Sequence, residues 1–261
     1  MGRTSQGQLS VPSYQSVVSA TSLKECYERV TGLAHNLDEL DVVEEVERYR
    51  TFWKPDTVRV LLLAESHVRT NHGDFAHRWS YGKDPVYEGN FVRFVYCLAN
   101  GERSLVNIPS NKGTWQFWKI LFSCLHPVSE NLEFGPILRS FTRDPGKRME
   151  NKIRLLRDLK AQGVWLVDAS IVGINGLAMS TKSRILRLCW ESYTGPMLKR
   201  LDPKPDRILV IGTGVKKALL NELSELAIER TEIPQPQARI DGGYWRYYQE
   251  CFEACSKHLN G

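Results

Sequence analysis

The chain lacks any apolar run long enough to cross a bilayer, so nothing in the sequence predicts a membrane-spanning helix. Residues 1–20 are rich in Ser and Gln, with neither an apolar segment nor an N-terminal basic cluster, so they do not resemble a secretion signal. We expect these residues to be poorly ordered. The expected location is the cytoplasm, without membrane attachment.

Cofactor motifs are also missing. Cys251 and Cys255 lie one helical turn apart, but no second close-spaced cysteine pair accompanies them, so we expect no metal site. The six cysteines are scattered, mostly among apolar neighbours, which is typical of reduced, buried thiols. The turn Gly212-Thr213-Gly214 lacks the third glycine of a dinucleotide fingerprint. We therefore expect no cofactor.

Charge is present but unevenly distributed. The net charge is +5, yet residues 1–57 contain 6 Lys/Arg against 9 Asp/Glu, whereas residues 139–160 contain 8 Lys/Arg against 3 Asp/Glu. Such a basic concentration can face phosphates. The alternative is a solvated helix face, because residues 149–161 have amphipathic helical spacing.

Apolar runs alternate with helical segments along the chain. The runs that begin at Val58, Val164 and Arg207 are typical of strands buried on both faces of a parallel sheet. The spacing predicts helices over 21–50 (with a break near residues 35–36), 91–98, 115–122, 149–161, 183–201, 215–228 and 244–258. Residues 69–88 are expected to form a long loop, rich in Gly, His and aromatics, of a length that is usually functional. The pattern predicts a three-layer α/β/α fold with a mostly parallel sheet of about four strands. We expect one domain over 21–261, with a helical N-terminal extension over 21–57.

The first apolar run ends in three polar side chains, Glu65, Ser66 and His67, that are able to do acid–base chemistry. Ligands of open α/β sheets bind beyond the carboxyl ends of the strands, which is where these residues would emerge. This position makes them a candidate site. The alternative is a strand followed by an ordinary polar loop.

Four segments together resemble the uracil-DNA glycosylase superfamily. Residues 61–67 look like its catalytic-loop strand, 163–168 are similar to its base-reading strand, 204–212 match its late Lys-Pro strand, and 234–239 fall where its leaving-group loop lies. The resemblance covers the chain from about Val58 to the C-terminus. It implies hydrolysis of the N-glycosidic bond of a base flipped out of DNA.

Catalytic roles follow from this resemblance. The family carries a carboxylate or Asn in the first loop, where a carboxylate favours the oxocarbenium-like sugar and accepts a proton from the attacking water. Ser66 occupies the Asp/Asn position but cannot supply charge, so we expect Glu65 to act as the catalytic carboxylate. His67 replaces a proline and is either a proton donor or a plain loop histidine. Gln235 stands where His or Asn steadies the leaving base. Its neutral amide is a weaker donor, and losing a well-placed donor costs on the order of 10²–10³ in rate.

Base recognition is implied for Asp168, which stands in the position of the uracil-reading Asn. An ionised Asp only accepts hydrogen bonds, so it would favour a base with an exocyclic amino group over uracil. The alternative is an Asp that caps a helix from Ser170 onward. Trp79 or Tyr81 lies near the register of the aromatic that stacks on the flipped base, with core packing as the alternative.

Phosphate contacts are predicted for four residues, Lys112, Thr114, Gln237 and Arg239, and Thr114 is also a possible helix N-cap. The leading hypothesis is a monomeric DNA glycosylase that acts on a damaged or deaminated base in single- or double-stranded DNA. Two alternatives remain open: a catalytically inactive nucleic-acid-binding protein of the same fold, and a small-molecule hydrolase using Glu65 and His67.

Overall fold

The computed structural model describes residues 20–82, 87–129, 131–226, 228–235 and 244–257. Its centre is a parallel four-stranded sheet of order β4-β1-β5-β6, made of β1 (Val60–Ala64), β4 (Val164–Asp168), β5 (Arg207–Ile211) and β6 (Glu229–Ile233). Every residue of β1, β4 and β5 is buried, because helices cover both faces of the sheet. The predicted three-layer α/β/α fold is confirmed.

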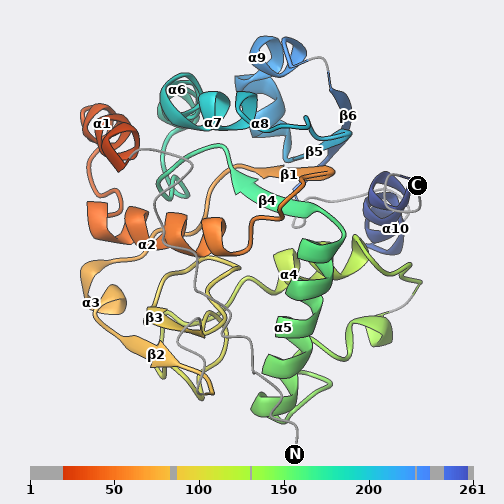
Figure 1. Ribbon diagram of the computed structural model, residues 1–261. Coiled ribbons are helices and arrows are strands. Elements are labelled where there is room, and N and C mark those ends of the chain that lie inside the picture. Colours follow the sequence, from red (N-terminus) through yellow and green to blue (C-terminus); the bar gives the residue numbers. More distant parts are fainter. Residues whose placement is uncertain (1–19, 83–86, 130, 227, 236–243, 258–261) are drawn as a thin grey trace, which may run out of the picture.

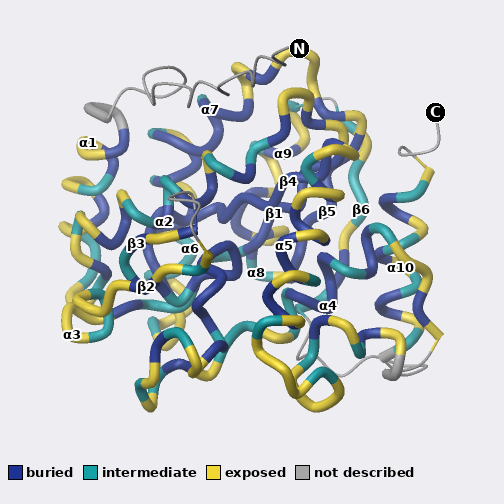
Figure 2. The backbone as a smooth tube through the Cα atoms, turned by 60° about the horizontal axis from the view of Figure 1, so that its bottom comes forward, coloured by how far each residue is buried: buried dark blue, intermediate teal, exposed yellow. Residues whose placement is uncertain are grey.

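Figure 1 shows the two helical layers. Above the sheet in that view lie α1 (Ala20–Thr31), α6 (Met179–Cys189), α7 (Gly195–Lys199), α8 (Thr213–Ala218) and α9 (Leu220–Ser224). Below it lie α2 (Leu40–Phe52), α4 (Trp115–Ser123) and α5 (Pro145–Ala161), while α10 (Tyr244–Ser256) packs on α4 beside β6. Burial follows the same layers: β1, β4 and β5 are dark blue and buried inside, while yellow, exposed residues lie on the outer helices (Figure 2). The buried hydrophobic residues form one cluster that reaches from Leu23 to Cys255.

Most predicted helices are present, with shifted ends. The N-terminal pair breaks between Thr31 and Leu40, as the sequence predicts. Helix α5 begins earlier than predicted, because Asp144 accepts a hydrogen bond from the backbone N–H of Lys147 (3.0 Å) and caps the helix. The helix predicted over 183–201 instead comprises α6, a π-helical turn η3 (Trp190–Thr194) and α7, and the one predicted over 215–228 splits into α8 and α9.

Two sequence predictions about secondary structure are wrong. Residues 91–98 form no helix but a buried series of turns, in which the side-chain amide of Asn100 donates to the Phe94 carbonyl. Residues 69–88 are more regular than expected, because they include α3 (His72–Phe75), β2 (Arg78–Ser80) and the start of β3 (Glu88–Asn90), and β2 and β3 pair antiparallel. A 3₁₀ turn η2 (Asn131–Phe134) precedes α5.

Other expectations concern cysteines and terminal residues. All six cysteines are free and buried.

Among the described residues, no helix has both the length and the apolar character that crossing a bilayer requires. Residues 1–19 and the predicted phosphate contacts Gln237 and Arg239 lie outside the described residues.

Candidate functional site

The carboxyl edge of the sheet holds Glu65 directly after β1. The Glu65 carboxylate forms an ion pair with Lys182 of α6 at 3.3 Å, and both side chains are partly exposed. The next residue, Ser66, uses its hydroxyl oxygen to accept a hydrogen bond from the backbone N–H of Ile174 (3.3 Å). Glu65 thus presents a charged, partly accessible carboxylate at the edge where the sequence predicts a site.

Gln235 lies close to the same edge, on the Gly212–Gly214 turn. A Cβ atom placed on Gly212 would come within 2.9 Å of the Gln235 Cγ, and one placed on Gly214 within 2.9 Å of Glu65 Oε1. Gly212 also has φ +103°, a backbone conformation that favours glycine. Glu65 and Gln235, which are 170 residues apart, therefore both pack against one glycine turn.

A buried ion network lies beneath this edge, and His67 is at its centre. His67 Nε2 is 3.2 Å from Asp38 Oδ2, and His67 Nδ1 is 3.5 Å from Asp168 Oδ2. Asp168 also pairs with the guanidinium of Arg50 at 3.4 Å, and Arg50 pairs in turn with Glu47. His67, Asp38, Asp168 and Arg50 are each at most 4% exposed, so the four charges compensate one another away from water.

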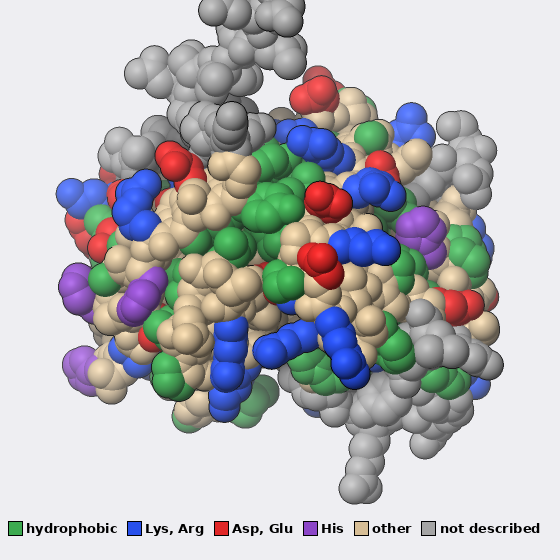
Figure 3. Space-filling view, turned by 90° about the horizontal axis from the view of Figure 1, so that it is seen from below, with side chains coloured by type: hydrophobic (Ala, Val, Ile, Leu, Met, Phe, Trp, Pro, Cys, Tyr) green, Lys and Arg blue, Asp and Glu red, His purple; other side chains and the backbone are tan. Residues whose placement is uncertain are grey.

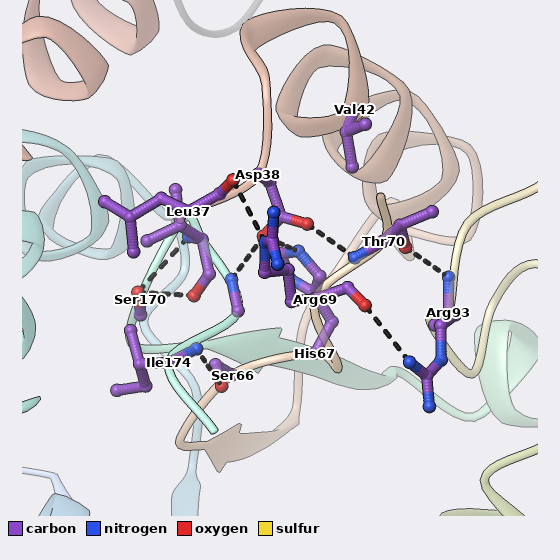
Figure 4. A network of polar contacts seen from close by, with 12 residues as sticks. Leu37, Asp38, Val42, Ser66, His67, Arg69, Thr70, Arg93, Ser170 and Ile174 are labelled. Carbon is purple, nitrogen blue, oxygen red and sulfur yellow. Dashed lines mark hydrogen bonds and ion pairs between the residues drawn. The ribbon is translucent and has the colours of Figure 1, made fainter. Parts of the chain in front are cut away.

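Asp38 connects three parts of the chain in this network (Figure 4). Besides the His67 contact, its carboxylate accepts hydrogen bonds from the backbone N–H of Thr70 (2.7 Å) and of Gly173 (2.5 Å). Gly173 is required here, because a Cβ at that position would lie 2.4 Å from the backbone N of Arg69. The segment between α1 and α2 is thereby held against the loops that follow β1 and β4.

These contacts set the protonation state of the network. Burial disfavours the charged form of His67, but the Asp38 charge and the neighbouring Asp168 carboxylate outweigh it and raise the His67 pKa to about 9. Burial alone would raise the pKa of Asp38, yet the His67 charge and the two backbone donors lower it. At neutral pH the pair is therefore imidazolium and carboxylate.

Two of the predicted site residues are consequently committed to the interior. Asp168 directs its carboxylate to Arg50 and His67, so the acceptor that would read a base is occupied by cations. The alternative role of Asp168 as a cap of a helix from Ser170 onward is wrong, because the next helix begins at Met179. The structure brings His67 and Asp168 together, but not with the partly exposed Glu65–Lys182 pair.

The predicted stacking aromatics belong to the β2–β3 hairpin. Trp79 is 5% exposed, donates its indole N–H to the hydroxyl of Tyr49 (2.8 Å) and stacks on the same ring. The hydroxyl of Tyr81 donates to the carbonyl of Gly146 at the start of α5 (3.2 Å). As placed, Trp79 offers no open face to a base.

Lys112 and Thr114 lie instead in a cavity of about 690 Å³ between the loop 100–114, α4, α5 and the segment 137–141. Five cationic side chains line it: Arg103, Lys112, Lys119, Arg139 and Lys152. Three aromatic rings join them, those of Trp115, Trp118 and Phe141. Thr114 makes no side-chain cap of α4, contrary to expectation, and its hydroxyl oxygen accepts from Asn100 (3.4 Å).

The basic run 139–160 is divided between interior and surface. On the buried face of α5, Arg148 and Lys152 bind Glu102, with the Lys152 Nζ 2.7 Å from Glu102 Oε1. On the outside, Arg143 and Lys147 are exposed at the start of α5, at the lower end of the molecule in Figure 1. Lys and Arg side chains gather near the middle of that lower face, with histidines toward its margins (Figure 3). The run is therefore neither wholly a phosphate-facing patch nor wholly a solvated helix face.

No family model matches this chain, and no curated protein matches it. The segments that resemble the uracil-DNA glycosylase superfamily contain β1, β4 and β5, which are adjacent in the sheet, and the chain that follows β6. The relationship to that superfamily therefore stays a prediction from the sequence.

Several residues of both sites were missed by sequence reasoning. Asp38 and Arg50 come from the N-terminal extension, to which the resemblance does not reach. Trp115 and Trp118 fall in the helix predicted over 115–122 and received no binding role from the sequence, although the Lys112-Gly113-Thr114 stretch just before them combines a cation with a glycine. That combination was the one feature of the sequence that could have indicated a binding site here.

One surface cluster in the described residues has the composition of a metal site. Glu39, Asp41 and His72 are all exposed, and each offers a ligand atom within 4.8 Å of the others. Exposed acidic groups commonly cluster without an ion, and His72 and Glu39 already pair at 3.1 Å. The cluster carries no functional assignment.

Proposed function

We propose that this protein binds single-stranded nucleic acid through the basic aromatic cavity that contains Lys112 and Thr114. The supporting observation is that five cations and three aromatic rings line one cavity, whose single carboxylate, Glu102, is already paired with Arg148 and Lys152. Cations attract the phosphate backbone, and exposed rings stack on unpaired bases, which is how strands are bound without sequence preference.

The exposed aromatics favour a single strand over a duplex. Trp115 is 50% exposed and Phe141 is 43% exposed, and both lie at the cavity. Bases inside a duplex are stacked on one another, whereas those of a single strand can stack on such rings. This corresponds to the nucleic-acid-binding alternative drawn from the sequence.

Replacing Lys112 and Arg139 together with alanine should weaken oligonucleotide binding and flatten its salt dependence. Each phosphate contact to a single strand contributes about 0.7 to the slope of log affinity against log salt, so the slope should fall by about 1.4. Fluorescence polarisation with a labelled single strand across a salt series measures both quantities.

The matched control replaces Lys217 and Arg200, two exposed cations of the helical layer above the sheet in Figure 1. This control removes the same net charge and should leave the slope within error of the parent protein. Equal losses in the two double variants would show that only net charge matters, and the cavity would not be the binding site.

Hydrolysis of an N-glycosidic bond is a second candidate function, at the carboxyl edge. The observation in its favour is that Glu65 and Gln235, the expected catalytic carboxylate and leaving-group donor, pack on the same glycine turn. A partly exposed carboxylate can orient water and favour a developing oxocarbenium ion. Lys182, at 3.3 Å from Glu65, forms an ion pair with that carboxylate.

Glu65→Gln should lower the rate of abasic-site formation by about 10²–10⁴-fold if this edge is catalytic, the loss expected for an acid–base group. The assay incubates single- and double-stranded oligonucleotides carrying deaminated or damaged bases, then cleaves abasic sites with alkali. Glu44→Gln, an exposed glutamate of α2, serves as the control. A parent protein that releases no base from any substrate would exclude the hydrolase while leaving binding intact.

A further inference from the structure

The loop that forms one side of the basic aromatic cavity is held in a fixed conformation. The side-chain amide of Asn111 donates to the carbonyls of Ala99 (3.0 Å) and Val106 (2.8 Å), and its oxygen accepts from the N–H of Gly101 (2.5 Å). Gly113, at φ +79°, approaches so closely that a Cβ there would lie 2.8 Å from the Gly101 Cα. Lys112 is thus presented by a loop that is ordered before any ligand binds, which lowers the entropy cost of binding.

The floor of the cavity is an ion cluster whose negative charge is already neutralised. Glu102, Arg148 and Lys152 are at most 4% exposed, and both cations contact the one carboxylate. Burial would raise the Glu102 pKa, but Arg148 and Lys152 outweigh it and lower that pKa. An entering anion therefore meets no uncompensated carboxylate on this floor, and the cluster as a whole is cationic.

The inner wall combines cations with rings. Lys119 Nζ lies 5.1 Å from the ring centre of Trp115 and 4.8 Å from that of Phe134, and Lys152 Nζ lies 4.8 Å from the ring centre of Trp118. Burial lowers the pKa of both lysines, so a bound anion that offsets the lost hydration would favour their charged forms. The indole N–H of Trp118 is buried and has no hydrogen-bond partner within the described part of the chain.

The rim places stacking surface beside exposed cations. Large exposed hydrophobic side chains are few among the described residues, and two of the four, Trp115 and Phe141, lie at this cavity. Exposed apolar surface grouped with a charged rim is a mark of a binding site. Lys112 and Arg139 complete the rim as exposed cations.

The geometry points to a nucleotide site, in which a phosphate lies between Lys112, Arg139 and Lys119 and the attached base stacks on Trp115 or Phe141. This inference rests on the proposed function and specifies its ligand unit. A volume of about 690 Å³ lies in the usual range of small-molecule pockets, so one nucleotide of a strand fits inside rather than across the surface. A free nucleoside monophosphate carries both groups and should bind alone.

The test compares four probes by titration calorimetry at low salt: inorganic phosphate, a nucleoside, a nucleoside 5′-monophosphate and a short single-stranded oligonucleotide. We expect the monophosphate to bind at least tenfold more tightly than the phosphate or the nucleoside, and to displace the oligonucleotide. Trp115→Ala should weaken binding of the monophosphate by roughly tenfold or more, because stacking of the base on the ring is lost. Trp115→Phe should restore most of the affinity, because it keeps an aromatic ring at this position. Leu220→Ala removes an exposed hydrophobic residue that does not line the cavity and should change nothing.

The outcomes separate this inference from the proposed function. An oligonucleotide that binds with steep salt dependence, while the monophosphate neither binds nor competes, would overturn the nucleotide site and leave strand binding standing. If the monophosphate binds and the oligonucleotide does not, the proposed strand binding is overturned and the nucleotide site is supported. Circular dichroism of Trp115→Ala, compared with the parent, shows whether the variant is folded, and Arg139→Ala provides a second variant outside the core.

Discussion

Asp38→Ala is expected to lower the free energy of unfolding by about 3–5 kcal/mol, the range for breaking a buried ion pair by removing one partner. The Asp38 side chain is fully buried, and its loss leaves the imidazolium of His67 without its closest carboxylate. The backbone N–H groups of Thr70 and Gly173 lose their acceptor as well. Each buried donor left unpaired adds a desolvation cost.

Urea unfolding followed by circular dichroism at pH 7 measures this effect as a shift in midpoint at constant slope. The control is Glu39→Ala at the neighbouring position. Glu39 also pairs with a histidine, His72 at 3.1 Å, but both side chains are more than half exposed, so we expect a loss of no more than about 1 kcal/mol. Equal midpoints for Asp38→Ala and Glu39→Ala would show that the buried network stabilises the protein no more than the exposed Glu39–His72 pair does.

Local sequence patterns predict the buried strands of the sheet but not the contacts of Asp38. Strands β1, β4 and β5 were predicted because strands covered on both faces need apolar side chains at every position. Strand β6 was not predicted, because Glu229, Arg230, Thr231 and Glu232 break any apolar run, and only Ile233 of this strand is buried. Both β4 and β6 are edge strands, but β4 is buried at every residue whereas β6 is largely not, so β6 does not need an apolar side chain at every position.

The site was predicted in part for a similar reason. The end of a predicted strand placed Glu65 at the carboxyl edge, since parallel strands all end at one side of a sheet, whereas Gln235 was expected there only from the family resemblance. The direction of side chains beyond that edge depends on distant partners. Asp168 is 118 residues from Arg50, and their pairing decides that the carboxylate points into the core. Such long-range charge compensation leaves no periodic trace in the sequence.

The second large effect expected is a loss of stability in mild alkali, caused by His67. Its pKa is about 9 in the folded protein against an ordinary value of 6.5, because Asp38 and Asp168 stabilise the imidazolium. A group with a raised folded-state pKa contributes its full stability below pH 6.5 and loses it as pH rises through 9. A difference of this size corresponds to roughly 3 kcal/mol, which should disappear from the free energy of unfolding across that interval.

Urea midpoints at several pH values from 6 to about 9.5 test this expectation, with His67→Gln as the comparison. The variant cannot be protonated, so it should be less stable than the parent at pH 6 and should approach it at the alkaline end. Lys119 and Lys152 have pKa values lowered by burial and act in the opposite direction, but they are the same in both proteins and cancel in the difference. A difference between parent and variant that stays constant with pH would mean that His67 does not change protonation there. Asp38 and Asp168 would then have to hold the histidine by packing and hydrogen bonds rather than by its charge.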